Sequence, residues 1–176
     1  MKKIVLCLFF APIFSCAPLK VLMPKGEYPA TPIIQASNKS FEKVWDNVID
    51  YFAQNGIPIK IIDKSSGLII SDKARLTWSF ENKKFQLVNP AAFVVMPQIL
   101  DKFNEKPYKP QYVTGEWNVR IKAVGDKTTV NVNLYNIEGL YFEGYYSYYA
   151  HSAVMPVKID GRTTGVFERK FFESVQ

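Results

Sequence analysis

The sequence is poor in the residues that most metal and catalytic sites use. Its 176 residues include two cysteines and one histidine. Two cysteines exclude a disulfide framework and a thiolate metal cluster, and one histidine excludes histidine-rich metal sites and most catalytic triads. We therefore expect no metal site and no dissociable cofactor.

Long hydrophobic runs are also absent. The longest, Ile4–Phe14, has about eleven residues, whereas a helix needs about 20 to span a bilayer. It follows Lys2 and Lys3, and a basic stretch before a short apolar run is typical of a secretory signal peptide. We expect residues 1–15 to be removed from the mature chain.

The chain has no cluster of basic residues, although Lys and Arg number 22 against 16 Asp and Glu. Removal of residues 1–15 leaves a net charge of about +4, spread along the chain. Nucleic-acid binding requires a basic patch, so we exclude nucleic acid as a partner. With 48% hydrophobic and 15% aromatic residues, the composition fits one globular domain.

The residues before Cys16 indicate how the protein is anchored. Ile13 stands three positions before Cys16 and Ser15 directly before it, which resembles the cleavage site of a bacterial lipoprotein. The resemblance implies that the Cys16 thiol receives a covalent lipid, which inserts into a bilayer. Ala17 implies sorting to the outer membrane, with the protein facing the periplasm or displayed on the surface. The alternative is an ordinary secreted protein with an incidental Cys16.

Residues 16–37 carry four prolines and no apolar periodicity. This composition predicts an extended tether that follows the lipidated cysteine and holds the rest of the protein away from the membrane. A single domain is expected over residues 38–176.

Periodic apolar residues predict the main elements of this domain. A helix is expected over residues 41–52, with Ser37, Asn38 or Ser40 as its cap and Asn55-Gly56 as its end, and a second over residues 167–175. A short helix is expected over residues 98–103. Hairpins are expected from residues 57–61 with 68–71, 76–80 with 85–88, and 116–123 with 129–134.

The strands over 116–123 and 129–134 alternate strictly between apolar and polar residues. Such alternation means that one face of the sheet is buried and the other is wet. We therefore predict an α+β fold in which an antiparallel sheet of about four to six strands is covered on one face by an N-terminal and a C-terminal helix.

The run Phe41–Ser71 resembles small envelope lipoproteins with a helix-grip domain, such as the BamC-type accessory lipoproteins of outer-membrane assembly. The matching residues are Val44-Trp45, Gly56, Ile61–Asp63 and Ser66–Ile69. Thr163–Glu168 is similar to the closing-helix motif of related lipoproteins. The resemblance implies a helix-grip-like fold and a place in an envelope protein complex.

The segment from Glu138 to His151 contains five of the ten tyrosines. We predict a loop or long hairpin whose aromatic side chains bind a partner, because tyrosine combines a rigid apolar ring with a polar tip. The candidate contact residues are Tyr141, Phe142, Tyr145, Tyr146, Tyr148 and Tyr149. The alternative is that alternate tyrosines complete an edge strand and pack on a helix.

These features predict a membrane-anchored binding or scaffold subunit of a cell-envelope complex, and not an enzyme. His151 has no recognisable nucleophile or positioned water nearby in the sequence, so an acid–base role has no support. One alternative is a lipoprotein that binds cell-wall glycan or a small ligand through the Tyr-rich segment and the concave sheet face. Another is a hydrolase whose site has no recognisable motif.

We expect that replacing Tyr145, Tyr146 and Tyr148 with serine leaves the fold intact but abolishes capture of the partner. The measurement is co-purification from cells, with circular dichroism of the variant as the control for folding. Collapse of the fold would instead favour a packing role for these tyrosines.

Overall fold

The structure is a computed structural model that describes residues 20–100, 107–142 and 156–175. Its helices are α1 (Phe41–Gln54) and α2 (Val166–Val175). The strands of these residues are β1 (Lys20–Leu22), β2 (Ile33–Ser37), β3 (Ile59–Asp63), β4 (Leu68–Ser71), β5 (Ala74–Arg75), β6 (Trp78–Ser79), β7 (Val94–Val95), β8 (Gln98–Leu100), β9 (Pro107–Tyr108), β10 (Tyr112–Val124), β11 (Lys127–Phe142), β12 (Pro156–Asp160) and β13 (Arg162–Thr163).

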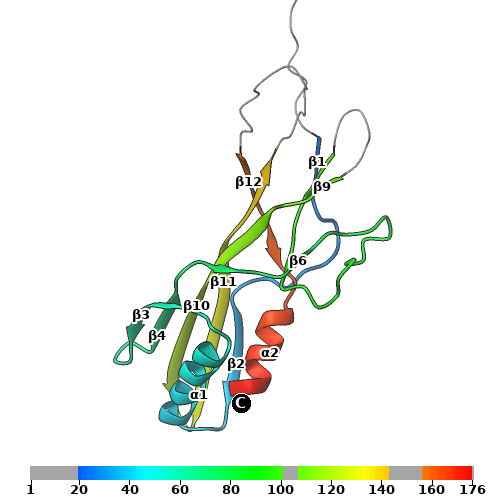
Figure 1. Cartoon of the computed structure of the whole chain (residues 1–176). Coiled ribbons are helices and arrows are strands. Elements are labelled where there is room, and N and C mark those ends of the chain that lie inside the picture. The colour runs from blue at the N-terminus through cyan, green and yellow to red at the C-terminus, as the bar shows by residue number, and fades with distance from the viewer. Residues whose placement is uncertain (1–19, 101–106, 143–155, 176) are drawn as a thin grey trace, which may run out of the picture.

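A seven-stranded antiparallel sheet is built on the long hairpin of β10 and β11 (Figure 1). β4 and β5 pair with β10, and β3 extends the sheet from β4. β2 and β12 pair with different stretches of β11. Two three-stranded sheets, β1-β8-β9 and β13-β7-β6, complete the described fold. The predicted α+β class is confirmed, but the main sheet has more strands than the four to six expected.

The two helices lie together at one end of the sheet, while β1, β9 and β12 lie toward the other end (Figure 1). α1 packs on β10 and on α2, and the Asn47 side-chain amide donates a hydrogen bond of 3.1 Å to the Val175 carbonyl. The core-facing residues of the hairpin include Trp117, Val119 and Val132, which are almost completely buried. Alternation along the strands therefore selects the face that the helices cover.

The ends of α1 follow from its sequence. Of the three candidate caps, Ser40 is the one used, because its side chain accepts a hydrogen bond from the Lys43 amide. Gly56 follows the helix with φ of +62°, a left-handed conformation that favours glycine. The prediction of this helix and its end is confirmed.

An aromatic cluster joins the two helices to the sheet. Phe167 of α2 lies with its ring centroid 4.7 Å from that of Trp117, and Phe171 lies 5.3 Å from Tyr51 of α1. These rings are buried, so their apolar area stabilises the packing of α2, which at ten residues is too short to be stable alone.

Glu168 is fully buried in the first turn of α2. Its carboxylate oxygens lie 2.8 and 3.0 Å from the Thr163 hydroxyl, which also accepts a hydrogen bond from the Gly165 amide. Burial raises the pKa of Glu168, because the charged form is poorly solvated there. Thr163 and Glu168 together fix where the C-terminal helix begins.

Two local predictions are wrong. Residues 20–37 are not a free tether, because β1 pairs with β8 and β2 pairs with β11. The prolines of this stretch lie outside the β2 ladder, where they leave its hydrogen bonds intact. Residues 98–100 form a strand and not the start of a helix, since they pair with both β1 and β9.

The hairpin predicted from residues 76–80 with 85–88 is confirmed only next to its turn, because β6 in the first run pairs with β7 instead. The Val88 amide donates to the Phe80 carbonyl at 2.9 Å, and Glu81 and Leu87 form an antiparallel bridge. Among the described residues, no helix has the length and apolar character needed to cross a membrane.

Two glycines at hairpin turns provide a matched test of this packing. Gly67 and Gly125 have φ of +70° and +63°, so alanine at either position costs about 1–2 kcal/mol of backbone strain. A Cβ at Gly67 would also overlap the Ile121 carbonyl oxygen, whereas one at Gly125 meets open space. We expect Gly67→Ala to lower the free energy of unfolding clearly more than Gly125→Ala in urea titrations. Equal losses would contradict the close packing of the β3-β4 turn on β10.

Candidate functional site

The structure places few of the predicted site residues. Cys16, Tyr145, Tyr146, Tyr148 and Tyr149 lie outside the described residues. Phe142 ends β11, where its backbone pairs with that of Pro156. The predicted partner-binding segment therefore begins on β11, and the rest of it lies outside the described residues.

Tyr141 is a core residue. Its side chain is 1% exposed, and its hydroxyl donates a hydrogen bond of 2.8 Å to the Pro97 carbonyl. Burial raises the pKa of the Tyr141 phenol, so it stays protonated and keeps this hydrogen bond. A partner contact at Tyr141 is therefore wrong for this structure, because the ring fills the interior.

A β-bulge at Asn136 explains why Tyr141 points inward. Residues Asn136 and Ile137 of β11 lie opposite Gly115 alone, and Asn136 has φ of +49°. Before the bulge the buried residues have even numbers, such as Val132; after it they have odd numbers, such as Tyr141. One extra residue thus moves the following side chains to the other face of the sheet.

The outer edge of β11 has a gap beside this bulge. β2 pairs with Thr128–Val132 and β12 pairs with Glu138–Phe142. In the described part of the chain, no strand pairs with residues 133–137 on this edge. The bulge thus lies where neither neighbour continues the sheet.

A pocket of about 580 Å³, which we call the polar pocket, occupies this gap. It is lined by Tyr28–Thr31, Asn133–Glu138 and Asp160–Thr163. Its walls thus come from the N-terminal residues, from the bulged strand and from the turn between β12 and β13.

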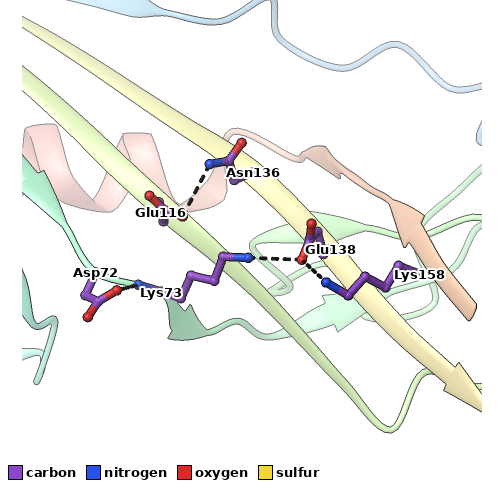
Figure 2. Close-up of polar contacts among 6 residues, drawn as sticks. All are labelled: Asp72, Lys73, Glu116, Asn136, Glu138 and Lys158. Atoms are coloured by element: carbon purple, nitrogen blue, oxygen red, sulfur yellow. Dashed lines mark hydrogen bonds and ion pairs between the residues drawn. The ribbon is translucent and has the colours of Figure 1, made fainter. Parts of the chain in front are cut away.

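Polar side chains beside the bulge are held by hydrogen bonds. The Tyr135 hydroxyl donates to one Glu116 carboxylate oxygen at 3.0 Å. The Asn136 amide donates to the other at 3.3 Å, as Figure 2 shows. Burial, followed by the hydrogen bond and charge of Glu116, raises the pKa of Tyr135. The phenol is therefore a hydrogen-bonding group and is poorly suited to act as a base.

Glu138 pairs with two lysines, Lys73 between β4 and β5 and Lys158 of β12. Its carboxylate lies 3.0 Å from the Lys73 ammonium and 3.4 Å from that of Lys158, as Figure 2 shows. The hydrogen bond from Lys73 is the main cause that lowers the pKa of Glu138. These exposed ion pairs orient the side chains but add little stability.

The residues beside the polar pocket can form many hydrogen bonds. Asn133, Asn136 and Tyr135 offer neutral groups, and Arg162 offers a guanidinium that suits carboxylate or phosphate. Within the described ranges, no group of three or more His, Cys, Asp or Glu side chains could hold a metal ion. His151 lies outside these ranges. The arrangement is suited to binding a polar molecule by hydrogen bonds.

A second hollow, which we call the apolar groove, has a volume of about 650 Å³. It lies between the N-terminal residues and the 76–88 hairpin. The residues that line it are Val21–Lys25, Glu81–Lys83, Phe85, Val88, Met96 and Gln98.

Residues 20–37, which we call the N-terminal arm, contribute to both hollows, and Glu81 holds the arm in place. The Glu81 carboxylate accepts hydrogen bonds from the amides of Lys25 and Gly26 at 2.8 and 2.7 Å, and from the Tyr28 hydroxyl at 2.5 Å. Burial acts to raise the pKa of Glu81, but these hydrogen bonds outweigh it and lower the pKa.

Sequence reasoning missed this clamp and the bulge. Glu81 is an isolated acidic residue whose three partners lie more than 50 positions away along the chain, so no local pattern reveals it. For Asn136 one signal was available, because asparagine is enriched among residues with positive φ.

We expect Glu81→Gln to loosen the N-terminal arm, because an amide accepts fewer and weaker hydrogen bonds than a carboxylate. Amides of residues 20–28 should exchange with deuterium faster at pH 7, while those of β10 keep their protection. The lowered pKa means that Glu81 stabilises the fold above its unfolded pKa, and that this is lost as pH falls through its folded pKa. Glu173→Gln, an exposed change on α2, is the control. Unchanged exchange in the arm would contradict the clamp.

No protein-family model matches the chain. A search of curated proteins likewise finds no match. Its function is therefore inferred from the residues of this chain and from the geometry of the arm, the sheet edges and the two hollows.

Proposed function

We propose that this protein is a membrane-anchored lipoprotein of the periplasm that acts as a binding subunit of a cell-envelope complex. Its anchor is a lipid on Cys16, and its domain is helix-grip-like. An antiparallel sheet with α1 before most of its strands and α2 after them supports the helix-grip-like description.

The position of the cleavage site supports the anchor. Cleavage before Cys16 removes only residues 1–15. In the described part of the chain the buried core cluster begins with Val44, and the first residue packed against it is Ile33, so this cleavage leaves the core intact. Lys20 follows Cys16 by four positions, which span at most about 14 Å when fully extended. A lipid on Cys16 would therefore hold β1 close to the bilayer.

The free edge of β3 is the observation that carries the binding role. β3 is the last strand on its side of the main sheet, and within the described residues it pairs with β4 alone. Ile59, Ile61 and Ile62 are 37, 44 and 55% exposed, and the neighbours Ile61 and Ile62 point to opposite faces. An extended segment of a partner can add to such an edge by main-chain hydrogen bonds and cover the isoleucines.

We expect Ile62→Lys to reduce recovery of the envelope partner at least tenfold, because a charge would be buried where the partner strand docks. Val124→Lys is the matched control, since Val124 is 56% exposed at the far turn of the β10-β11 hairpin. The measurement is photo-crosslinking in living cells from Lys60, an exposed residue of β3, and from Tyr146, followed by mass spectrometry. Absence of a dominant protein adduct from either position would contradict the binding role.

The anchor has its own test. We expect the wild-type chain to incorporate radiolabelled palmitate in cells and to fractionate with membranes. Cys16→Ser should accumulate as an unlabelled precursor, because serine has no thiol to accept the lipid. Labelling of the Cys16→Ser variant would contradict the anchor.

The polar pocket favours a second function, the binding of cell-wall glycan or another polar ligand. Its amide, phenol and guanidinium groups match the hydroxyl and carboxyl groups of such molecules. Sedimentation with purified peptidoglycan sacculi that is lost in Arg162→Ala would favour this function. Arg162 is exposed, so its removal leaves the core intact.

A further inference from the structure

The apolar groove has exposed hydrophobic side chains on both of its walls. Val21, Leu22 and Met23 on its arm side are 41, 40 and 51% exposed. Phe85 and Val88 on its hairpin side are 54 and 71% exposed. Contiguous apolar side chains of this kind mark a surface that contacts another molecule or a membrane.

The charges around the groove are basic. Lys25 and Lys83 line it, and Lys25 places its ammonium 5.7 Å from the centre of the Phe85 ring. Lys20 and Lys84 are exposed and directly adjoin lining residues in the chain. Aliphatic and aromatic side chains bordered by lysines are characteristic of surfaces that lie in the interface of an anionic membrane.

The Glu81 carboxylate, which also lines the groove, does not outweigh these lysines. It accepts hydrogen bonds from the Lys25 and Gly26 amides and from the Tyr28 hydroxyl, and its charge offsets one of the two lining lysines. The outward charge of the lining residues is therefore positive, and the chemistry that complements it is a layer of phosphate headgroups above hydrocarbon.

The groove also begins where the chain leaves the anchor. Its first lining residue, Val21, follows Cys16 by five positions, which span at most about 18 Å. These few residues are short enough for a lipid on Cys16 to keep the groove within reach of the bilayer surface.

We infer that the apolar groove is a second membrane contact, in which Val21, Leu22, Phe85 and Val88 enter the headgroup region of a bilayer that contains anionic lipids. Lys20, Lys25, Lys83 and Lys84 bind its phosphates. This inference rests on the proposed lipid anchor. It turns a flexible attachment through the acyl chains into an oriented one, with the arm and the 76–88 hairpin facing the membrane.

The test uses the full chain, processed and acylated in cells, and reconstituted into vesicles of phosphatidylethanolamine and phosphatidylglycerol. Cys16 is the only cysteine after residue 15 and is acylated, so an introduced cysteine is the only free thiol. A polarity-sensitive fluorophore is attached at Val88→Cys in one sample and at the control Val124→Cys in another. Both sites are exposed, so neither label disturbs the core.

At Val88 we expect a blue-shifted emission of several-fold higher intensity that is quenched by spin-labelled lipids; at Val124 we expect the emission of a probe in water. Flotation with vesicles but equal, unquenched emission at both sites would overturn the groove contact while leaving the anchor standing. Failure to float would overturn the anchor and this inference together. A blue shift at Val88 that lipids do not quench would place a protein segment in the groove and overturn the membrane contact.

The charged border has a matched variant pair. Lys83→Glu should lower the emission intensity of the Val88 probe several-fold, to near its value in water, because the variant places an acidic group against the phosphates. Lys60→Glu, on the exposed strand β3, makes the same change in net charge far along the chain from the groove. The same loss in both variants would show a response to net charge alone and would overturn the role of the lysine border.

Discussion

The pairing of β10 with β11 is the constraint on which the rest of the fold depends. Six of the main sheet's seven strands either form this hairpin or pair directly with it, and the seventh, β3, pairs with β4. β2 and β12 share the outer edge of β11, and the bulge at Asn136 lies between them. The same hairpin thus supplies the floor of the core and, where its edge has no strand partner among the described residues, the wall of the polar pocket.

Local patterns predicted the elements whose partners are close in sequence. α1, with Ser40 as its cap and Gly56 at its end, and the β3-β4 and β10-β11 hairpins each contain their own periodicity and turn residues. The N-terminal arm could not be found this way, because β2 is short and its partner strand is distant. The polar pocket and the apolar groove both depend on that arm, so neither could be predicted.

The bulge shows how one residue limits functional reasoning from a pattern. Extrapolating the alternation of Val130, Val132 and Leu134 along β11 turns Tyr141 toward solvent, whereas the extra residue at Asn136 turns it into the core. Tyrosine composition alone therefore could not separate a contact residue from a packing residue. The surfaces that the described fold does leave open are the β3 edge, the polar pocket and the apolar groove, and all three are suited to binding.

The pairing of β2 with β11 also sets an order of events during synthesis. Ser37 and Ile33 must wait for Thr128 and Val132, which lie more than about 90 positions later in the chain, a large separation for a contact to close. At roughly 5 to 20 residues per second, the arm is made roughly 5 to 20 s before its partner strand exists. The arm therefore emerges well before β11, and its isoleucines lack their partner strand throughout that interval.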